Sequence, residues 1–324
     1  MSKSPDKIIL SICIPTWNRA KFLDCCLNAI EEQLKDIDSS ELELYVSDNC
    51  SEDNTEEVVN DYIKKGLPIT YNKNAKNLGA AGNFLRCMQF ASGKYILLLG
   101  DDDILYPDAI SFLLDLLRNN DYGLIHFCPI RKNEHTKLIF DDIDEFFKTV
   151  SYWFTFISGN IFQKKVVPQI SPEGYFWTHL LQMPYYIKSA LSSTQNVIVY
   201  KDILKISLDG DSNGGYNFYE VFVDGYLSIW REFLNRQEIS KGVYDALKRD
   251  IYEKMVYNYN MKLLIHRKGV KDAEDGKRGT FMIDNAWKIL FRNYWNKLYF
   301  WASFPNMFFQ SVKQTIWQVV KGNR

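Results

Sequence analysis

The sequence predicts an α/β protein with one mostly parallel β-sheet flanked by helices, followed by a helical C-terminal extension. Three observations support this prediction. Short apolar runs alternate with amphipathic stretches over the first 130 residues, which is the pattern of parallel strands joined by crossover helices. Polar or turn-forming residues follow the strand candidates. Helix-like stretches dominate the last third of the chain.

The expected elements follow one another in chain order. Strand candidates are short apolar runs bounded by turn residues, and they lie at residues 8–14, 42–47, 69–72, 95–99, 124–128 and 158–162. Helix candidates have apolar positions at helical spacing, and they lie at residues 20–34, 55–65, 80–91, 108–117, 177–190 and 216–267. The glycine-rich segment 207–215 is expected to form a loop.

Length and organisation predict one large domain with a smaller helical region after it. A chain of 324 residues can bury a large core as one domain or two. We expect a first domain at residues 1–215, with halves at 1–130 and 131–215, and a helical region at residues 216–324.

The composition narrows the classes of function. With 39 Lys and Arg against 40 Asp and Glu, the chain lacks the net positive charge that captures nucleic acid. Its cysteines do not show the repeated C-x-x-C spacing of a zinc site. The first residues lack the features of a signal peptide, and no stretch is as apolar and long as a spanning helix. We expect a cytoplasmic protein that meets a membrane, if at all, from one side.

Three consecutive carboxylates follow the strand candidate at residues 95–99. They belong to Asp101, Asp102 and Asp103 and come directly after Gly100. Adjacent carboxylates repel one another unless a cation or hydrogen-bond donors compensate them, and hard divalent cations take oxygen ligands. A metal ion that bridges the protein and a diphosphate explains the cluster. The alternative is that an aspartate caps the following helix.

Polar clusters also follow the first two strand candidates, at residues 16–19 and 48–51. Ligands of open α/β sheets bind outside the carboxyl ends of the strands, so we expect both clusters and residues 100–103 to converge on one crevice. The turn after the first strand has neither the G-x-G-x-x-G motif of a dehydrogenase nor a P-loop motif. Both of these enzyme classes are therefore disfavoured.

Four motifs stand in order along this part of the chain. They read ICIPTWNR at residues 12–19, VSDNCSEDNT at 46–55, NLGAAGN at 77–83 and GDDD at 100–103, with Pro107 beyond. Together they resemble the inverting, nucleotide-diphospho-sugar glycosyltransferases of family 2, which have the GT-A fold. The resemblance implies a nucleotide-sugar half at residues 1–130 and an acceptor half at 131–215. It also suggests a role in bacterial surface polysaccharide or glycan biosynthesis.

The resemblance further implies roles for individual residues. The nucleotide-sugar cleft would be lined by Pro15, Thr16, Arg19, Asp48, Asn77, Gly79, Asn83 and Asp101. Asp48 would accept a hydrogen bond from the base, while Gly79 permits close backbone approach to a ligand; a helix cap and a turn residue are the alternatives. The sequence departs from the family's D-x-D pattern, whose first carboxylate position is Gly100 here. Asp102 and Asp103 become the expected ligands of Mn²⁺ or Mg²⁺, supported by Asp101.

An inverting transfer needs a general base that takes the proton of the acceptor hydroxyl. Many family members supply it from a Glu-Asp pair, which is absent from the corresponding region at residues 174–181. His179 is the first candidate, because imidazole exchanges protons near neutral pH. Glu173, Asp209 and Asp211 are the alternatives. His179 could equally be an ordinary helix residue.

The tail at residues 287–324 is rich in aromatic and basic residues and has no acidic residue. Phe309, Val312, Ile316 and Val319 or Val320 recur at helical spacing, as in an amphipathic helix at a membrane interface. Aromatic rings prefer the headgroup level, and lysines favour anionic lipids. The alternative is a helix that docks on the first domain or on a second copy of the chain.

The sequence thus predicts a metal-assisted, inverting glycosyltransferase of the hexosyltransferase type. It would move a sugar from a nucleotide diphosphate donor, a UDP-sugar, to a hydroxyl of a saccharide or lipid-linked glycan. Its expected location is the cytoplasm, with peripheral contact to the inner face of the membrane. Two alternatives are a sugar nucleotidyltransferase and a glycan-binding or scaffold protein without transfer activity.

Overall fold

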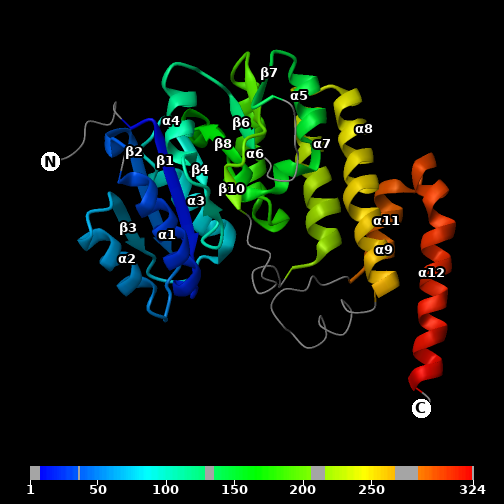
Figure 1. Cartoon of the computed structure of the whole chain (residues 1–324). Helices are drawn as coiled ribbons and strands as arrows, with labels where there is room; N and C mark the ends of the chain where they lie inside the picture. The colour runs from blue at the N-terminus through cyan, green and yellow to red at the C-terminus, as the bar shows by residue number, and fades with distance from the viewer. Residues whose placement is uncertain (1–7, 36, 128–134, 206–215, 267–283, 323–324) are drawn as a thin grey trace. The chain divides into compact units, whose positions relative to one another are not determined.

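The computed structural model describes residues 8–35, 37–127, 135–205, 216–266 and 284–322 (Figure 1). The chain divides into two compact units, Met1–Ser207 and Leu208–Arg324. The first unit contains all of the β-structure described, and the second is helical.

The first unit is built on an eight-stranded sheet with the strand order β3-β2-β1-β4-β8-β6-β9-β7. These strands are β1 Leu10–Thr16, β2 Leu42–Asp48, β3 Ile69–Lys73, β4 Tyr95–Leu98, β6 Leu124–Phe127, β7 Lys137–Phe140, β8 Asn160–Gln163 and β9 Asn196–Val199. Strands β3, β2, β1 and β4 run parallel, as do β6 and β9. Strands β8 and β7 are antiparallel to their neighbours. Two further short strands, β5 Ile104–Leu105 and β10 Leu204–Lys205, pair separately.

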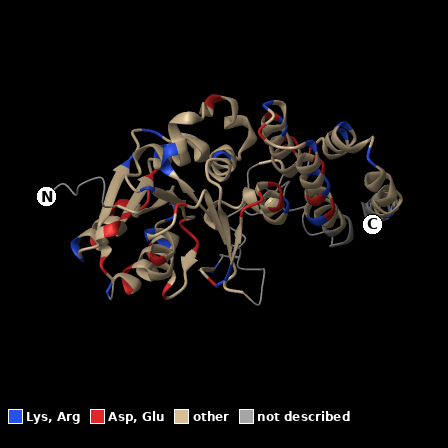
Figure 2. Cartoon of the chain, turned by 90° about the horizontal axis from the view of Figure 1, so that it is seen from above, with Lys and Arg blue, Asp and Glu red and all other residues tan. Residues whose placement is uncertain are grey.

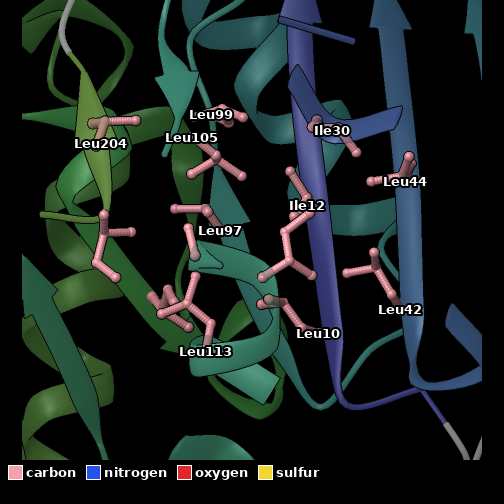
Figure 3. Packing of buried hydrophobic residues seen from close by; sticks show 14 of the residues in the cluster. Leu10, Ile12, Ile30, Leu42, Leu44, Leu97, Leu99, Leu105, Leu113 and Leu204 are labelled. Atoms are coloured by element: carbon pink, nitrogen blue, oxygen red, sulfur yellow. The ribbon is translucent and has the colours of Figure 1, made fainter. Parts of the chain in front are cut away.

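Helices cover both faces of this sheet. They are α1 Ala20–Leu34, α2 Thr55–Lys64, α3 Gly79–Phe90, α4 Ala109–Arg118, α5 Ile143–Val150 and α6 Gln182–Leu191. Because side chains alternate along a strand, Leu10 and Ile12 pack with α1 and α4 on one face (Figure 3). Cys13 points to the other face, where its thiol meets the Cys87 carbonyl of α3.

The elements expected in the first half are confirmed with small shifts at their ends. Helix α1 has the expected bounds, and α2, α3 and α4 differ from theirs by a single residue at one or both ends. The helix expected at residues 177–190 begins only at Gln182, because a 3-10 helix at Phe176–Thr178 precedes it. Strands β7 and β9 and helix α5 were not expected. Four of the seven pairings in the large sheet are parallel, so the α/β fold with a mostly parallel sheet is correct.

The second unit consists of helices that pack through aromatic side chains. They are α7 Tyr226–Asn235, α8 Lys241–Asp250, α9 Tyr257–His266, α11 Ala286–Tyr294 and α12 Leu298–Gly322. Trp230, Tyr252 and Tyr294 are fully buried between them. Among the described helices, none is both apolar enough and long enough to cross a membrane.

Candidate active site

The site forms where the parallel strands β1, β2 and β4 end. Thr16 and Asp48 are the last residues of β1 and β2 and lie side by side in register. The Asn49 amide donates to the Thr16 carbonyl at 2.9 Å, and the Thr16 hydroxyl donates to Oδ2 of Asp101 at 2.7 Å. These contacts bring the ends of all three strands together at one edge of the sheet.

The three aspartates after β4 meet different partners. Asp101 is buried between Thr16 and the Arg19 guanidinium, whose Nη1 lies 3.2 Å from Oδ1. Asp102 faces Nη2 of Arg19 at 2.8 Å. Asp103 accepts a hydrogen bond from the Ser158 hydroxyl at 2.6 Å. Arg19 therefore pairs with both Asp101 and Asp102, and its single positive charge offsets one of their two negative charges.

Gly100 is needed for the aspartates to approach one another. A Cβ at this position would lie 3.0 Å from a carboxylate oxygen of Asp102 and 3.0 Å from one of Asp103. The Gly100 amide also donates to the Ser158 hydroxyl at 2.9 Å. The glycine that replaces the first carboxylate of the family's motif thus makes room for the two that follow.

The Arg19 guanidinium is held by further contacts. Its Nη2 is buried and pairs with Oδ2 of Asp102. The guanidinium also lies over the Phe22 ring, 4.6 Å from its centroid, which fixes its plane. The Arg19 side chain is 23% exposed, and guanidinium groups are common partners of phosphate oxygens.

Burial raises the pKa of Asp101 to about 7, although Arg19 and the Thr16 hydroxyl act to lower it. Its folded pKa therefore lies above its unfolded value of about 3.9. The folded protein therefore holds this proton more tightly than the unfolded chain does. Protonated Asp101 adds to the free energy of unfolding at low pH, and this contribution is lost as the pH rises through the folded pKa.

We expect the melting temperature of the protein in chelator-containing buffer to fall more between about pH 6 and about pH 8 than that of Asp101→Asn, whose amide does not titrate. Differential scanning calorimetry of both proteins measures this difference. Equal falls in the two proteins would contradict the burial argument.

The loops around the crevice are held by asparagine side chains. Asn49 Nδ2 donates to Asn77 Oδ1 at 2.8 Å, and Asn49 Oδ1 accepts from the Leu78 amide at 2.8 Å. The Asn77 side chain in turn caps the Gly79 amide at 2.8 Å. Gly79 has φ +73°, a left-handed conformation that glycine adopts without strain.

Asp48 and Asn83, both expected in the cleft, are buried. Asp48 accepts hydrogen bonds from the Ser51 amide at 2.8 Å and the Tyr71 hydroxyl at 2.7 Å. Asn83 accepts from the Ser47 hydroxyl at 2.7 Å and donates to the Ser47 carbonyl at 2.9 Å. Both side chains hold the ends of β1 to β3 and the start of α3 in place. Each Asp48 oxygen accepts one of these hydrogen bonds and has a second lone pair that can accept another.

Two residues of this site were not expected from the sequence. Ser158 contacts both Gly100 and Asp103, but it precedes β8, far along the chain. Tyr71 binds Asp48 from β3. Trp17, within the cluster expected at residues 16–19, is 44% exposed. Pro15 was also expected here and is half-buried in β1.

The base candidates lie in different segments. Glu173 is exposed in the 3-10 helix Pro172–Gly174. His179 is also exposed and follows the 3-10 helix Phe176–Thr178 with φ 56°. It is therefore not part of a regular helix, and histidine is one of the residues that adopt this left-handed conformation more often than most. Asp209 and Asp211 lie outside the described residues.

The carboxylates after β4 are the candidate ligands of a divalent cation. Across the described ranges, no three His, Cys, Asp or Glu side chains are arranged to hold a metal ion by themselves. A Mg²⁺-type ion that also binds phosphates needs only one or two carboxylates. Asp102 pairs with Arg19 through Oδ2, so an ion would be held through its Oδ1. Two adjacent carboxylates, Asp102 and Asp103, fit the donor set that such an ion would need.

The chain is similar to known glycosyltransferases. Residues 11–176 match the profile of the family described as glycosyl transferase family 2. An abequosyltransferase of Salmonella typhimurium is 39% identical over 107 residues, which are 33% of this chain and 32% of the relative. A GalNAc(5)-diNAcBac-PP-undecaprenol beta-1,3-glucosyltransferase of Campylobacter jejuni is 27% identical over 250 residues, 72% of this chain and 76% of the relative. The chain thus spans about a third of the first relative's length.

Solved structures share the fold. S. aureus TarS 1-349 in complex with UDP-GlcNAc has a TM-score of 0.56 at 15% identity, covering 81% of this chain and 78% of that one. Mannosyltransferase PcManGT from Pyrobaculum calidifontis, in complex with GDP-Man and Mn²⁺, has a TM-score of 0.53 at 13% identity, covering 98% of this chain and 90% of that one. At these identities the likeness establishes the GT-A type of fold alone.

Proposed function

Because the chain belongs to glycosyl transferase family 2 and is therefore a glycosyltransferase, we propose that it takes its sugar from a nucleotide diphosphate donor, a UDP-sugar. The observation that carries this proposal is the cluster of Asp101, Asp102 and Arg19 at the ends of β1 and β4. It pairs carboxylates for a cation with a guanidinium donor for phosphate. A structural neighbour, TarS, is described with UDP-GlcNAc, which supports the same class of donor.

The acceptor in this proposal is a hydroxyl of a saccharide or lipid-linked glycan. The Campylobacter relative, of which the alignment covers 76%, is named for a diphospho-undecaprenol-linked acceptor. In the proposed organisation, residues 1–215 form the catalytic domain, with the donor half at 1–130 and the acceptor half at 131–215. Residues 216–324 form a separate helical region.

The proposed reaction inverts the anomeric carbon. The acceptor oxygen forms a bond to C1 of the sugar while the bond from C1 to the β-phosphate oxygen breaks, and the nucleoside diphosphate leaves with the bonding electrons. His179 takes the hydroxyl proton, with Glu173, Asp209 and Asp211 as the alternative bases. A Mn²⁺ or Mg²⁺ ion held by Asp102 and Asp103 would offset the charge of the leaving diphosphate.

The residues around the cleft have distinct tasks in this scheme. Thr16 and Asp101 hold Arg19 toward the phosphates, beside Pro15 at the end of β1. Asn77 and Gly79 shape the loop against which the sugar nucleotide lies. Asn83 holds the end of β2, and Asp48 offers its remaining lone pairs to the base.

Hydrolysis or transfer assays test the proposed donor. The full chain is incubated with UDP-, GDP-, CDP- and dTDP-sugars with and without Mn²⁺, and release of the nucleoside diphosphate is measured. Metal-dependent release from the UDP series is expected. Release from another series only, or from none of them by a protein shown to be folded, would overturn the donor proposal.

We also propose that the C-terminal helices contact an anionic membrane surface. Leu298 is 88% exposed, and Phe309 is 63% exposed on α12. Residues 287–324 contain six basic and no acidic residues, and Figure 2 marks the charged residues of the described helices. Of the six, Arg292 and Lys297 pair with Asp224 and Asp245. Exposed apolar side chains with a surplus of positive charge suit the interface of a bilayer that contains anionic lipid.

The double substitution Leu298→Gln and Phe309→Gln is expected to lower binding to phosphatidylglycerol vesicles by roughly tenfold or more, since burying one such side chain contributes about 1.5–3 kcal/mol. Vesicle sedimentation measures it. The matched control replaces two exposed isoleucines of the first unit, Ile63 and Ile139, by Gln. Equal loss in both variants, or no binding by the wild type, would overturn the membrane proposal.

A further inference from the structure

A group of basic residues lies in the helical unit and takes no part in the proposed transfer reaction. On α8, Lys248 stands one helical turn after Tyr244 and Asp245, so the three side chains share one face of the helix. Arg231 of α7 reaches this face, because its Nη2 donates to the Tyr244 hydroxyl at 3.3 Å. Lys297 reaches it from the residue before α12, because its Nζ lies 2.8 Å from Oδ1 of Asp245. Three basic side chains from separate segments, the Lys248 cluster, therefore converge: Arg231, Lys248 and Lys297.

Lys248 is buried without an opposite charge of its own. Only 8% of the residue is exposed, and across the described residues no carboxylate lies within ion-pair distance of its ammonium, whereas Lys297 has Asp245. The Lys248 Nζ lies 5.4 Å from the centroid of the Tyr294 ring, a contact that offsets the lost hydration of a cation only in part. Because a buried lysine is normally paired with an anion, a negatively charged ligand would complete this arrangement.

The cluster is open to a ligand from solvent. The Lys248 ammonium is not sealed off, in contrast to the Tyr294 hydroxyl, which is fully enclosed. Arg231 is exposed, and the Lys297 side chain is 27% exposed. Lys248 therefore lies deepest, and the two more exposed cations lie at the surface beside it.

The net charge of the cluster selects the class of anion. Burial lowers the pKa of Lys248 to about 8, and Lys297 and Arg231 act in the same direction, while Asp245 opposes them. Lys248 is therefore still mostly protonated at neutral pH. Three positive charges against the one negative charge of Asp245 leave a surplus of two. A phosphate monoester carries about −1.5 to −2 charges near neutral pH and matches this surplus, whereas a phosphodiester carries a single charge.

We propose that the Lys248 cluster binds the phosphate group of a phosphate monoester. The Lys248 ammonium and the Arg231 guanidinium donate to the phosphate oxygens, and Lys297 contributes its charge while it stays paired with Asp245. The proposal goes beyond the sugar transfer and the membrane contact proposed above. All of its residues lie in the helical unit, and binding needs no nucleotide sugar, metal ion or exposed apolar side chain.

Methyl phosphate is the probe, and isothermal titration calorimetry of the full chain in metal-free buffer at constant ionic strength is the measurement. Saturable binding is expected. Dimethyl phosphate, a phosphodiester with one charge fewer, is expected to bind several-fold more weakly. No saturable binding of methyl phosphate, or equal binding of dimethyl phosphate, would overturn the proposal.

Substitutions locate the site. Lys248→Met is expected to weaken binding of methyl phosphate roughly tenfold or more, since it removes a charged hydrogen-bond donor, and Arg231→Met several-fold. Lys248→Met should fold, because an apolar side chain of similar length in place of a buried charge is often neutral for stability. Lys241→Met, which changes an exposed lysine at the start of the same helix, is the matched control and should bind as the wild type does. Unchanged affinity in Lys248→Met would contradict the assignment.

Two further arms separate this site from others. Asp102→Asn should bind methyl phosphate as the wild type does, so a failure of the donor proposal leaves this result unaffected, and loss of binding in that variant would place the probe at the aspartates instead. Vesicles that contain phosphatidic acid, a lipid monoester, distinguish the sources of such a phosphate. Displacement of methyl phosphate by these vesicles assigns the site to a lipid headgroup, and lack of displacement assigns it to a soluble compound.

Discussion

Asp102→Asn is expected to lower kcat/KM for sugar transfer by roughly 10²–10³-fold, the effect of removing one group that stabilises charge in a transition state. The amide keeps the volume of the side chain but loses the charge that faces Arg19 at 2.8 Å and that would hold the cation. Initial rates over a range of Mn²⁺ and donor concentrations measure it.

Asp115→Asn is the matched control for this substitution. Asp115 lies on α4, has a side chain that is 71% exposed and pairs with Arg118. Its replacement makes the same chemical change on the surface and should leave the rate within about twofold of the wild type, since an exposed ion pair contributes little. A kcat/KM near the wild-type value in Asp102→Asn would remove this carboxylate from the mechanism.

His179→Asn is expected to lower kcat by roughly 10²–10⁴-fold, the contribution of a positioned general base, while the donor KM stays unchanged. Asparagine is chosen because it tolerates the φ of 56° at this position better than alanine does. The donor should still bind, since its expected contacts lie at the ends of β1, β2 and β4.

Glu173→Gln provides the comparison for this experiment. Both side chains are exposed in the segment between β8 and α6, so both variants should fold normally. The pH dependence of kcat distinguishes the two candidates. A general base must be deprotonated to act, so kcat falls at low pH, and only replacement of the true base removes this fall. Near-normal turnover of His179→Asn would exclude histidine as the base, and loss of turnover in Glu173→Gln instead would assign that role to the glutamate.

The fold of the first half was predictable because its signals are local. Helix α1 has the expected bounds, and its apolar residues Leu23, Leu27 and Ile30 repeat at helical spacing and are buried. The strands that end at Thr16 and Asp48 were expected from apolar runs followed by polar clusters. Convergence of those clusters follows from parallel pairing, since neighbouring parallel strands end at one edge.

The later part was less predictable because its determinants are distant in sequence. Strands β7 and β9 pair with each other, and β9 also pairs with β6, so their partners are distant in sequence. Ser158 reaches Asp103 only because β8 enters the sheet antiparallel between β4 and β6. Tyr71 contacts Asp48 through the pairing of β2 with β3. No local pattern indicates either contact.

Binding of donor nucleotides at the aspartates is the central claim, and a thermal-shift titration tests it most directly. The melting temperature of the full chain is measured with UDP, GDP, CDP and dTDP and their sugars, with and without Mn²⁺, beside Asp102→Asn. A ligand that binds only the folded state raises the melting temperature by mass action. We predict a Mn²⁺-dependent rise for the UDP series that is absent from Asp102→Asn. No rise with any nucleotide, or the same rise in the variant, would contradict the assignment of this cluster as the donor site.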